Sequence, residues 1–484
     1  MIDAKELNQL GLPSHPAVMP LAMKLVNKAV AGGAEALDVL ERIALLVKNP
    51  QAMTGDDLLG PLAEAVVEAF PGGIAFIPRK EPAPWKKWGD VDLDDTAVAQ
   101  MHKASLLPVA VRGALMPDAH LGYGLPIGGV LAVKDAVIPY AVGVDIACRM
   151  RLTVLDMPVS ALLKKRERLI QALEEETRFG MGAAFEKGER RAHAVMEEDW
   201  GFCRVLKGLR EKAWKQLGTS GGGNHFVEFG ELVLDAPALG LEKRTYLALL
   251  SHSGSRGSGE ETASHYSRLA MNLRPYLPQE LKHLAWLERN SAEGCEYWAA
   301  MQLMGRYASA GHELIHRHVL EHLGAEPLAH VENHHNFAWE EEHDGQTVIV
   351  HRKGATPAGP GVLGIVPGSM GSPGFVVRGK GNAGALNSCS HGAGRLMSRA
   401  AAVKSLDREK VHRFLEDRGV HLISGGLDEA PQAYKDIHAV MAAQSDLVDI
   451  LARFEPRLVK MAPDDGNGKG KRFKGGKQKS RECL

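Results

Sequence analysis

The sequence has few cysteines and no long apolar run, and these two features exclude whole classes of protein. It contains 5 cysteines among 484 residues, an odd number scattered along the chain. A disulfide framework is therefore not expected, and an important cysteine would be a metal ligand or a buried apolar residue. No apolar run approaches the roughly 20 residues that cross a bilayer, and the first residues carry neither the basic nor the apolar segment of a secretory signal. We expect a cytoplasmic protein that does not enter a membrane.

An excess of charge of one sign is also missing. The formal net charge is −1, from 58 basic and 59 acidic residues. Because so weak an overall field does not attract nucleic acid, any affinity for it would have to come from local patches. Hydrophobic residues make up 45% and charged residues 24% of the chain, which is the balance of a globular protein. The length allows a large catalytic core or two to three domains.

Hydrophobic spacing divides the chain into three parts. Residues 16–70 place apolar residues three and four positions apart, which predicts helices, and we assign residues 1–80 to an N-terminal helical extension. Residues 81–460 are assigned to a catalytic domain. Residues 461–484 are rich in glycine and lysine and predict a disordered basic tail. Two interpretations of this tail stay open, namely binding of RNA phosphates and simple solubilisation.

The central part mixes strands and helices. Short apolar runs predict strands between residues 109 and 155, and the stretches 218–230 and 245–259 each combine a strand with a glycine-rich loop. Helices are predicted at 161–194, 279–323, 395–402 and 407–417. Because the pattern has neither a fixed repeat nor a regular alternation of strand and helix, it favours an α+β fold over a doubly wound sheet.

Four segments each bring candidate metal ligands to a short apolar run. They contain Asp145 and Cys148, Asn224 and His225, His252, and the pair His334 and His335. A carboxylate, a thiolate and imidazoles form a set suited to manganese, zinc or iron. A cysteine sulfur can bridge two metals, and pairs of metals about 4 Å apart are common in phosphoryl chemistry. Each residue alone is more often structural, but their joint occurrence in loops favours a metal site.

Glycine-rich loops supply a second group of candidates. GTSGGGNH, HSGSRGSG, HRKGAT and SHGAGR allow backbone N–H groups to approach anions, and Arg256, Arg352, Lys353 and Arg395 offer positive charge. His391 lies in the last of these loops. A neutral imidazole is a competent nucleophile toward phosphorus, and a nearby cation would stabilise the developing charge. This segment alone leaves a capping or ligand histidine as the alternative.

Taken in order, nine segments between residues 85 and 460 resemble the RtcB family of RNA-splicing ligases. They are MPDAHLGYGLPIGG, GVDIAC, GGGNHFVE, HSGSRG, HHN, HRKGAT, PGSMG, SHGAGR and DEAPQAYKD. The resemblance implies mixed sheets with flanking helices around a central cleft for metal and nucleotide. It implies that Cys148 bridges two manganese ions, with Asp145 and His225 on one and His252 and His335 on the other. His391 corresponds to the histidine that GTP guanylylates. With the cations noted above, the nucleotide-site candidates are Asn224, Phe226, Glu228, Arg256, Ser369, Arg395, Tyr434 and Lys460.

The reaction implied by this resemblance joins RNA ends, with two manganese ions as cofactors and GTP as co-substrate. His391 would take GMP from GTP, and a 2′,3′-cyclic phosphate end would be opened to a 3′-phosphate that receives this GMP. A 5′-hydroxyl RNA would then displace the GMP. An archease-type activator is the further partner that the resemblance suggests. From the residues alone, a metal-dependent phosphoesterase of RNA ends is the main rival, and a non-catalytic RNA-binding protein is the second.

Three positions depart from the family pattern. Arg149 follows Cys148 where glycine is usual, which predicts a stiffer metal loop. Gly374 stands where a second guanine-contacting serine is usual, and Lys460 is not the last residue. Such a divergent branch suits the repair of damaged RNA as well as the splicing of tRNA.

Overall fold

The structure is a computed structural model that describes residues 2–70, 73–74, 76–89 and 93–463. Of the predicted basic tail, residues 461–484, the part from residue 464 onward lies outside the described residues, and Met461 is not in a disordered segment because it is the last residue of a strand. Helices account for the N-terminal part, as expected from its apolar spacing. They are α1 (Ala4–Gln9), α2 (Met19–Ala31), α3 (Ala36–Lys48) and α4 (Gly60–Ala69). Helix α3 ends at Lys48 because Asn49 precedes Pro50, and the residue before a proline is disfavoured in helical conformation.

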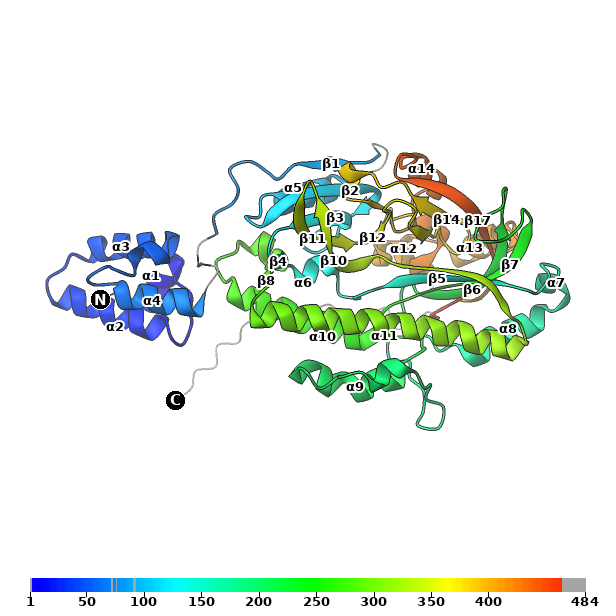
Figure 1. The fold of residues 1–484 in the computed structure, drawn as a ribbon, viewed down its shortest axis with the longest axis horizontal. Coiled ribbons are helices and arrows are strands. Elements are labelled where there is room, and N and C mark those ends of the chain that lie inside the picture. The colour runs from blue at the N-terminus through cyan, green and yellow to red at the C-terminus, as the bar shows by residue number, and fades with distance from the viewer. Residues whose placement is uncertain (1, 71–72, 75, 90–92, 464–484) are drawn as a thin grey trace.

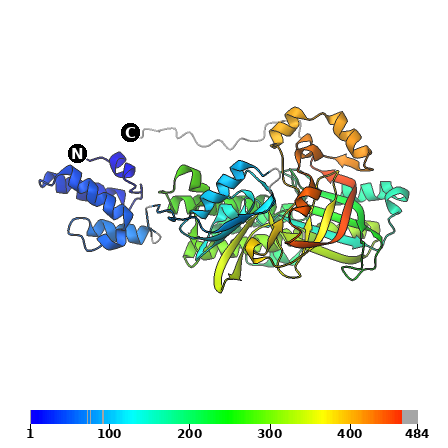
Figure 2. The same cartoon turned by 90° about the horizontal axis from the view of Figure 1, so that it is seen from above.

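These four helices enclose a core of their own. Leu7, Val26, Ile43 and Leu62 are fully buried among them. In both views the helices lie at one end of the molecule, apart from the sheets (Figure 1 and Figure 2). Tyr276 packs against this core and also against the largest core of the remaining chain. The boundary at residue 80 stays a prediction.

A five-stranded sheet forms one side of the main body. Its order is β1-β2-β3-β11-β10, and only β1 and β2 run parallel. The strands are β1 (Trp85–Lys87), β2 (Ala110–His120), β3 (Ile127–Val133), β11 (Gln346–Lys353) and β10 (Asn336–His343). Helix α5 (Asp95–Ser105) precedes β2 and packs on it. The sheet brings the loop after β2 beside the end of β11.

An eight-stranded sheet carries most of the site. Its path is β13-β14-β17-β6-β7-β5-β9, and β16 (His421–Ser424) pairs with β17. The strands of the path are β13 (Leu363–Val366), β14 (Gly374–Gly379), β17 (Val448–Met461), β6 (Phe226–Val233), β7 (Thr245–Ser253), β5 (Arg149–Leu155) and β9 (Pro327–His334). Residues alternate between two buried faces: Leu247 and Leu249 join one core, and Ala248 and Leu250 join another.

Helices flank this sheet, so mixed sheets with covering helices confirm the α+β class. The longest, α11 (Ala292–Leu323), lies along the sheet in Figure 1 with α8 (Arg166–Glu176) and α10 (Arg256–Leu273). Two of its histidines bond to the strands beneath. The Ser251 hydroxyl lies 2.7 Å from His312 Nδ1 and 2.8 Å from His316 Nε2. No helix within the described residues is long and apolar enough to cross a membrane.

Several predicted helix limits differ from the observed ones. The stretch 161–194 is helical only as α7 (Ala161–Lys164) and α8, because glycines follow and Gly180 adopts a left-handed φ of 111°. The helix predicted at 395–402 is α12 (Arg399–Ser405), which starts where the Ser398 side chain caps it. Helix α13 (Arg408–Glu416) matches its prediction within a residue at each end. The glycine-rich loop expected up to residue 259 already becomes α10 at Arg256.

Candidate active site and metal centre

Four strand ends of the eight-stranded sheet deliver the predicted metal ligands to one edge. Cys148 and His225 directly precede β5 and β6, His252 lies at the end of β7, and His335 follows β9. The antiparallel register pairs Phe226 with His252 and Arg149 with His334. Because these strands start or end at the same edge, residues far apart in the sequence become neighbours.

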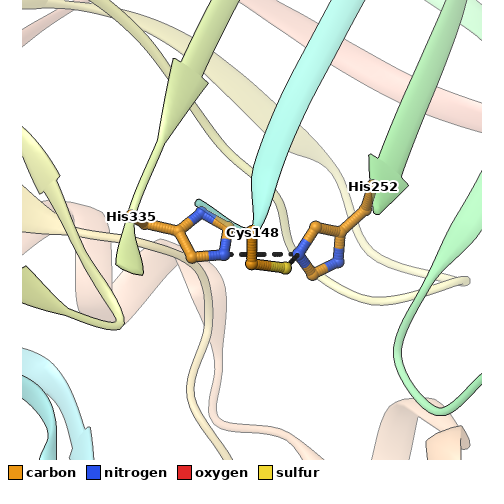
Figure 3. A group of neighbouring side chains, drawn as sticks. All are labelled: Cys148, His252 and His335. Carbon is orange, nitrogen blue, oxygen red and sulfur yellow. Dashed lines mark hydrogen bonds between the residues drawn. The ribbon is translucent and has the colours of Figure 1, made fainter. Parts of the chain in front are cut away.

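The donor atoms of these residues form two groups that share Cys148. Asp145, Cys148 and His225 make one group, and Cys148, His252 and His335 make the other, with the donor atoms of each group within 4.8 Å of one another. Cys148 Sγ lies 3.4 Å from His225 Nε2 and 3.1 Å from His252 Nε2. Figure 3 shows Cys148 between the rings of His252 and His335, whose Nε2 atoms are 3.3 Å apart. The structure brings all five predicted ligands together.

The hydrogen bonds of these rings decide which nitrogen faces the centre. His225 Nδ1 lies 2.8 Å from the carbonyl oxygen of Ser220, and His252 Nδ1 lies 3.0 Å from that of Asn224. Since a carbonyl oxygen only accepts, Nδ1 carries the proton in both rings and each Nε2 directs a lone pair inward. His225 Nε2 then faces Asp145 Oδ2 at 3.0 Å. Converging lone pairs of oxygen, sulfur and nitrogen fit divalent cations.

Charged and backbone groups hold the loop of Cys148 in place. Burial lowers the pKa of Arg149, but Glu332 partly offsets this by pairing with it. Glu332 also binds Arg151, with 2.6 Å between Arg151 NH1 and Glu332 Oε2. The Ser255 backbone N–H donates to Asp145 Oδ1 at 3.1 Å. Arg149 therefore anchors the residue after Cys148 to β9, where a glycine would make no such contact.

His391 lies beside this centre and is oriented by a residue that the sequence reasoning did not single out. Its Nδ1 lies 2.6 Å from Oδ2 of Asp118, and the backbone N–H groups of His391 and Gly392 donate to the same oxygen at 3.0 and 3.3 Å. Burial alone would raise the pKa of Asp118, but its electrostatic interaction and hydrogen bond with His391, with smaller contributions from His120 and Lys435, outweigh it and hold that pKa below its ordinary value. Asp118 is fully buried and ionised, so it accepts the Nδ1 proton and leaves the Nε2 lone pair of His391 free.

A cavity of about 800 Å³ opens in front of His391. The ring of His391 lies 5.1 Å from that of His335, centre to centre, so the cavity borders the candidate metal centre. Six of the eight predicted nucleotide-site residues line it: Asn224, Phe226, Glu228, Ser369, Arg395 and Tyr434. A cavity of this size accommodates a nucleotide.

The model of the family described as tRNA-splicing ligase RtcB matches residues 100–461 of the chain. The chain belongs to the RtcB family. RNA-splicing ligase RtcB of Escherichia coli strain K12 is 33% identical over 77% of this chain and 95% of its own length. The tRNA-splicing ligase RtcB of Nanoarchaeum equitans is 31% identical, over 76% of this chain and 91% of its own. RNA-splicing ligase RtcB of Mycobacterium bovis is 32% identical, over 74% of this chain and 98% of its own length.

Two residues expected at the nucleotide site of an RtcB-family protein lie away from the cavity. Val459 and Met461 of β17 line it, so the alternation of the strand turns Lys460 to the other side. The Lys460 ammonium group donates to the Leu173 carbonyl at 2.9 Å, and burial lowers its pKa to about 8. Arg256 is buried beneath the loop before Asn224, where its Nε donates to the Thr219 hydroxyl at 2.9 Å.

The cavity of this RtcB-family chain combines a fixed cation, Arg395, with a buried carboxyl group, Glu228. Arg395 NH1 binds Glu429 at 3.0 Å and the Tyr434 hydroxyl at 3.2 Å, so its position is set by buried groups. Burial raises the pKa of Glu228 well above its ordinary range, and no described residue forms an ion pair with it. Near Gly374, Ser372 lines the cavity and accepts a hydrogen bond from Ser369 at 3.0 Å. A second hydroxyl is therefore present two residues before the glycine.

Proposed function

We propose that this protein is a GTP- and manganese-dependent RNA ligase. It joins a 2′,3′-cyclic phosphate or 3′-phosphate end to a 5′-hydroxyl end through a histidine–GMP intermediate. Membership of the RtcB family supports the RNA ligase activity. The observation that carries the nucleotide chemistry is His391, whose Nδ1 is bound by Asp118 while the ring lines a nucleotide-sized cavity beside the ligand set.

The first step is attack of His391 Nε2 on the α-phosphorus of GTP. The Nε2 lone pair forms the new N–P bond, the bond to the bridging oxygen breaks, and pyrophosphate leaves with that electron pair. Asp118 keeps the proton on Nδ1 throughout and stabilises the positive charge that develops on the ring. Arg395 faces the same cavity and offers positive charge to the phosphoryl oxygens.

The RNA steps use the same cavity. Water opens the cyclic phosphate by breaking the bond to the 2′-oxygen, which gives a 3′-phosphate. An oxygen of this phosphate attacks the GMP phosphorus and breaks the N–P bond to His391. The 5′-hydroxyl oxygen of the second RNA then attacks the 3′-phosphate, loses its proton and expels GMP. Asp145, Cys148, His225, His252 and His335 would hold two manganese ions, which when bound supply positive charge to these phosphoryl oxygens.

Asp118→Asn tests the orientation of His391. The oxygen that bonds Nδ1 also accepts from the backbone N–H groups of His391 and Gly392, so the amide oxygen would take its place, and the variant would lose the negative charge that holds the Nδ1 proton and stabilises the ring during attack. We expect guanylylation to slow by roughly 100-fold or more through kcat. Because Asp118 does not line the cavity, KM for GTP should stay near its original value. A variant with unchanged kcat would contradict the positioning role.

Glu228→Gln tests how the base is recognised. Burial favours the neutral acid in the empty cavity, but the N1–H and the N2 amino group of guanine would donate to Glu228 and favour its carboxylate, which accepts from both, whereas an amide must turn one donor toward them. We expect KM for GTP in guanylylation to rise on the order of 10- to 100-fold, as for loss of a hydrogen bond to a charged group. Inosine triphosphate lacks the amino group, so its KM should rise less in Glu228→Gln than the KM for GTP does. An equal rise in KM for both nucleotides would mean that Glu228 does not contact the N2 amino group of guanine.

The rival function is a metal-dependent phosphoesterase of RNA ends, which would need the same ligands but no nucleotide. Incubation with labelled GTP and manganese separates the two, because only the ligase acquires acid-labile label on the protein. Titrating manganese against zinc with joining as the readout tests the metal.

We further propose a cytoplasmic location and a role in tRNA splicing or RNA repair, with an archease-type activator as a partner. Joining in the presence and absence of such an activator tests that dependence.

A further inference from the structure

The loop between β2 and β3, residues 121–126, presents an exposed aromatic ring at the cavity. Tyr123 is 69% exposed and Leu121 is 58% exposed, and both line the cavity that contains His391. Two rings pack beside Tyr123: Tyr140 of α6 (Pro139–Val142) and His283 of the short helix η3 (Gln279–Leu284). Their centres lie 6.4 and 5.8 Å from that of Tyr123, in edge-to-face geometry, so most of the ring remains uncovered.

The backbone of this loop is held at three successive residues. The Gln100 side chain donates to the carbonyl of Gly122 at 2.6 Å and accepts from its N–H at 3.1 Å. The Lys353 ammonium group donates to the Tyr123 carbonyl at 2.6 Å. Gly124 has a φ of +72°, and a Cβ there would lie 3.0 Å from the His283 carbonyl oxygen. A rigid backbone thus presents a ring whose exposure does not stabilise the fold, which is the arrangement of a preorganised binding site.

The chemistry of this opening suits the end of a nucleic acid. An exposed tyrosine ring stacks on a nucleobase of any sequence. Arg399, which is half exposed and pairs with Glu429 at 3.0 Å, lines the same cavity and carries positive charge for the phosphate backbone. The proposed function assigns the guanine of GTP to Phe226 and the buried Glu228, which line the same cavity. The exposed ring of Tyr123 is therefore available to stack on a nucleobase other than this guanine.

We propose that Tyr123 is the stacking platform for the terminal nucleobase of the RNA strand that carries the phosphate. This inference rests on the proposed ligase function. The strand with the phosphate is the one whose end first meets the guanylate on His391, and Tyr123 borders the same cavity as that imidazole. Tyr123 would act as a positioning residue, since it holds the strand and takes no part in bond making.

Replacement of the ring tests this assignment on the full-length protein. Tyr123→Ala and Tyr123→Leu should raise KM for the 3′-phosphate strand by roughly 10-fold or more, within the range of a single base–aromatic stack. Tyr123→Phe and Tyr123→Trp keep a ring and should stay near the original KM. Guanylylation by labelled GTP without RNA should be unchanged in all four. Phe202→Ala is the matched control, because this exposed aromatic residue does not line the cavity.

A strand that ends in an abasic nucleotide makes the test specific for stacking. If the base stacks on Tyr123, the abasic strand binds the original protein and Tyr123→Ala with nearly equal KM. If Tyr123→Ala raises KM equally for the abasic and the normal strand, the proposal is overturned. A rise in KM only for GTP, or only for the 5′-hydroxyl strand, would also overturn it. Failure of the original protein to become guanylylated would instead overturn the proposed function, so the two failures are distinguishable.

Discussion

His391→Ala is expected to lose both transfer of GMP to the protein and joining of RNA ends, each by at least about 10³-fold. No neighbouring side chain can replace a covalent nucleophile whose lone pair is directed into the cavity. That direction follows from the 2.6 Å bond between His391 Nδ1 and Asp118. Labelled GTP measures the first loss, and a pair of RNA strands measures the second. The content of bound manganese should not change, because His391 belongs to neither group of ligands.

A second histidine variant controls for general damage. His412 lies on the exposed side of α13 and does not line the cavity, so His412→Ala should join RNA at the original rate. Acid-labile GMP on the His391→Ala protein would remove the covalent mechanism. Loss of GMP transfer in both variants would show that the effect is not specific to His391.

The convergence of the metal ligands was predictable because of where they lie in the sequence. Cys148 and His225 precede apolar runs that became β5 and β6, and His252 lies at the end of another that became β7. A polar residue at the end of a buried strand cannot contribute to the core and lies at the sheet edge. The pairing of the strands was not predictable in this way. Strand β3 pairs Val133 with Ile349, and local hydrophobic spacing contains no signal for so distant a partner.

The orientation of single side chains was harder to predict than their place in the chain. Asp118 lies within β2 among buried residues, and the only signal for it is a carboxylate inside an otherwise buried run. Such a group needs a specific partner, which here is His391. Lys460 illustrates the opposite case, because a shift of one residue along β17 decides whether a side chain faces the cavity.

Cys148→Ala should remove both metals at once, whereas His335→Ala and His225→Ala should each affect one. Cys148 is the only member common to the two groups of ligands found among the described residues at this edge. Loss of a ligand lowers metal affinity by more than the about 10- to 100-fold that a partner outside the coordination shell contributes. After loading with manganese and removal of the excess, Cys148→Ala should therefore retain no stoichiometric metal and join no RNA. Cys389→Ala is the matched control, since this buried cysteine belongs to neither group and should keep two equivalents. Two equivalents retained by Cys148→Ala would mean that the sulfur does not bridge the metals, and the shared position between His252 and His225 would then need another explanation.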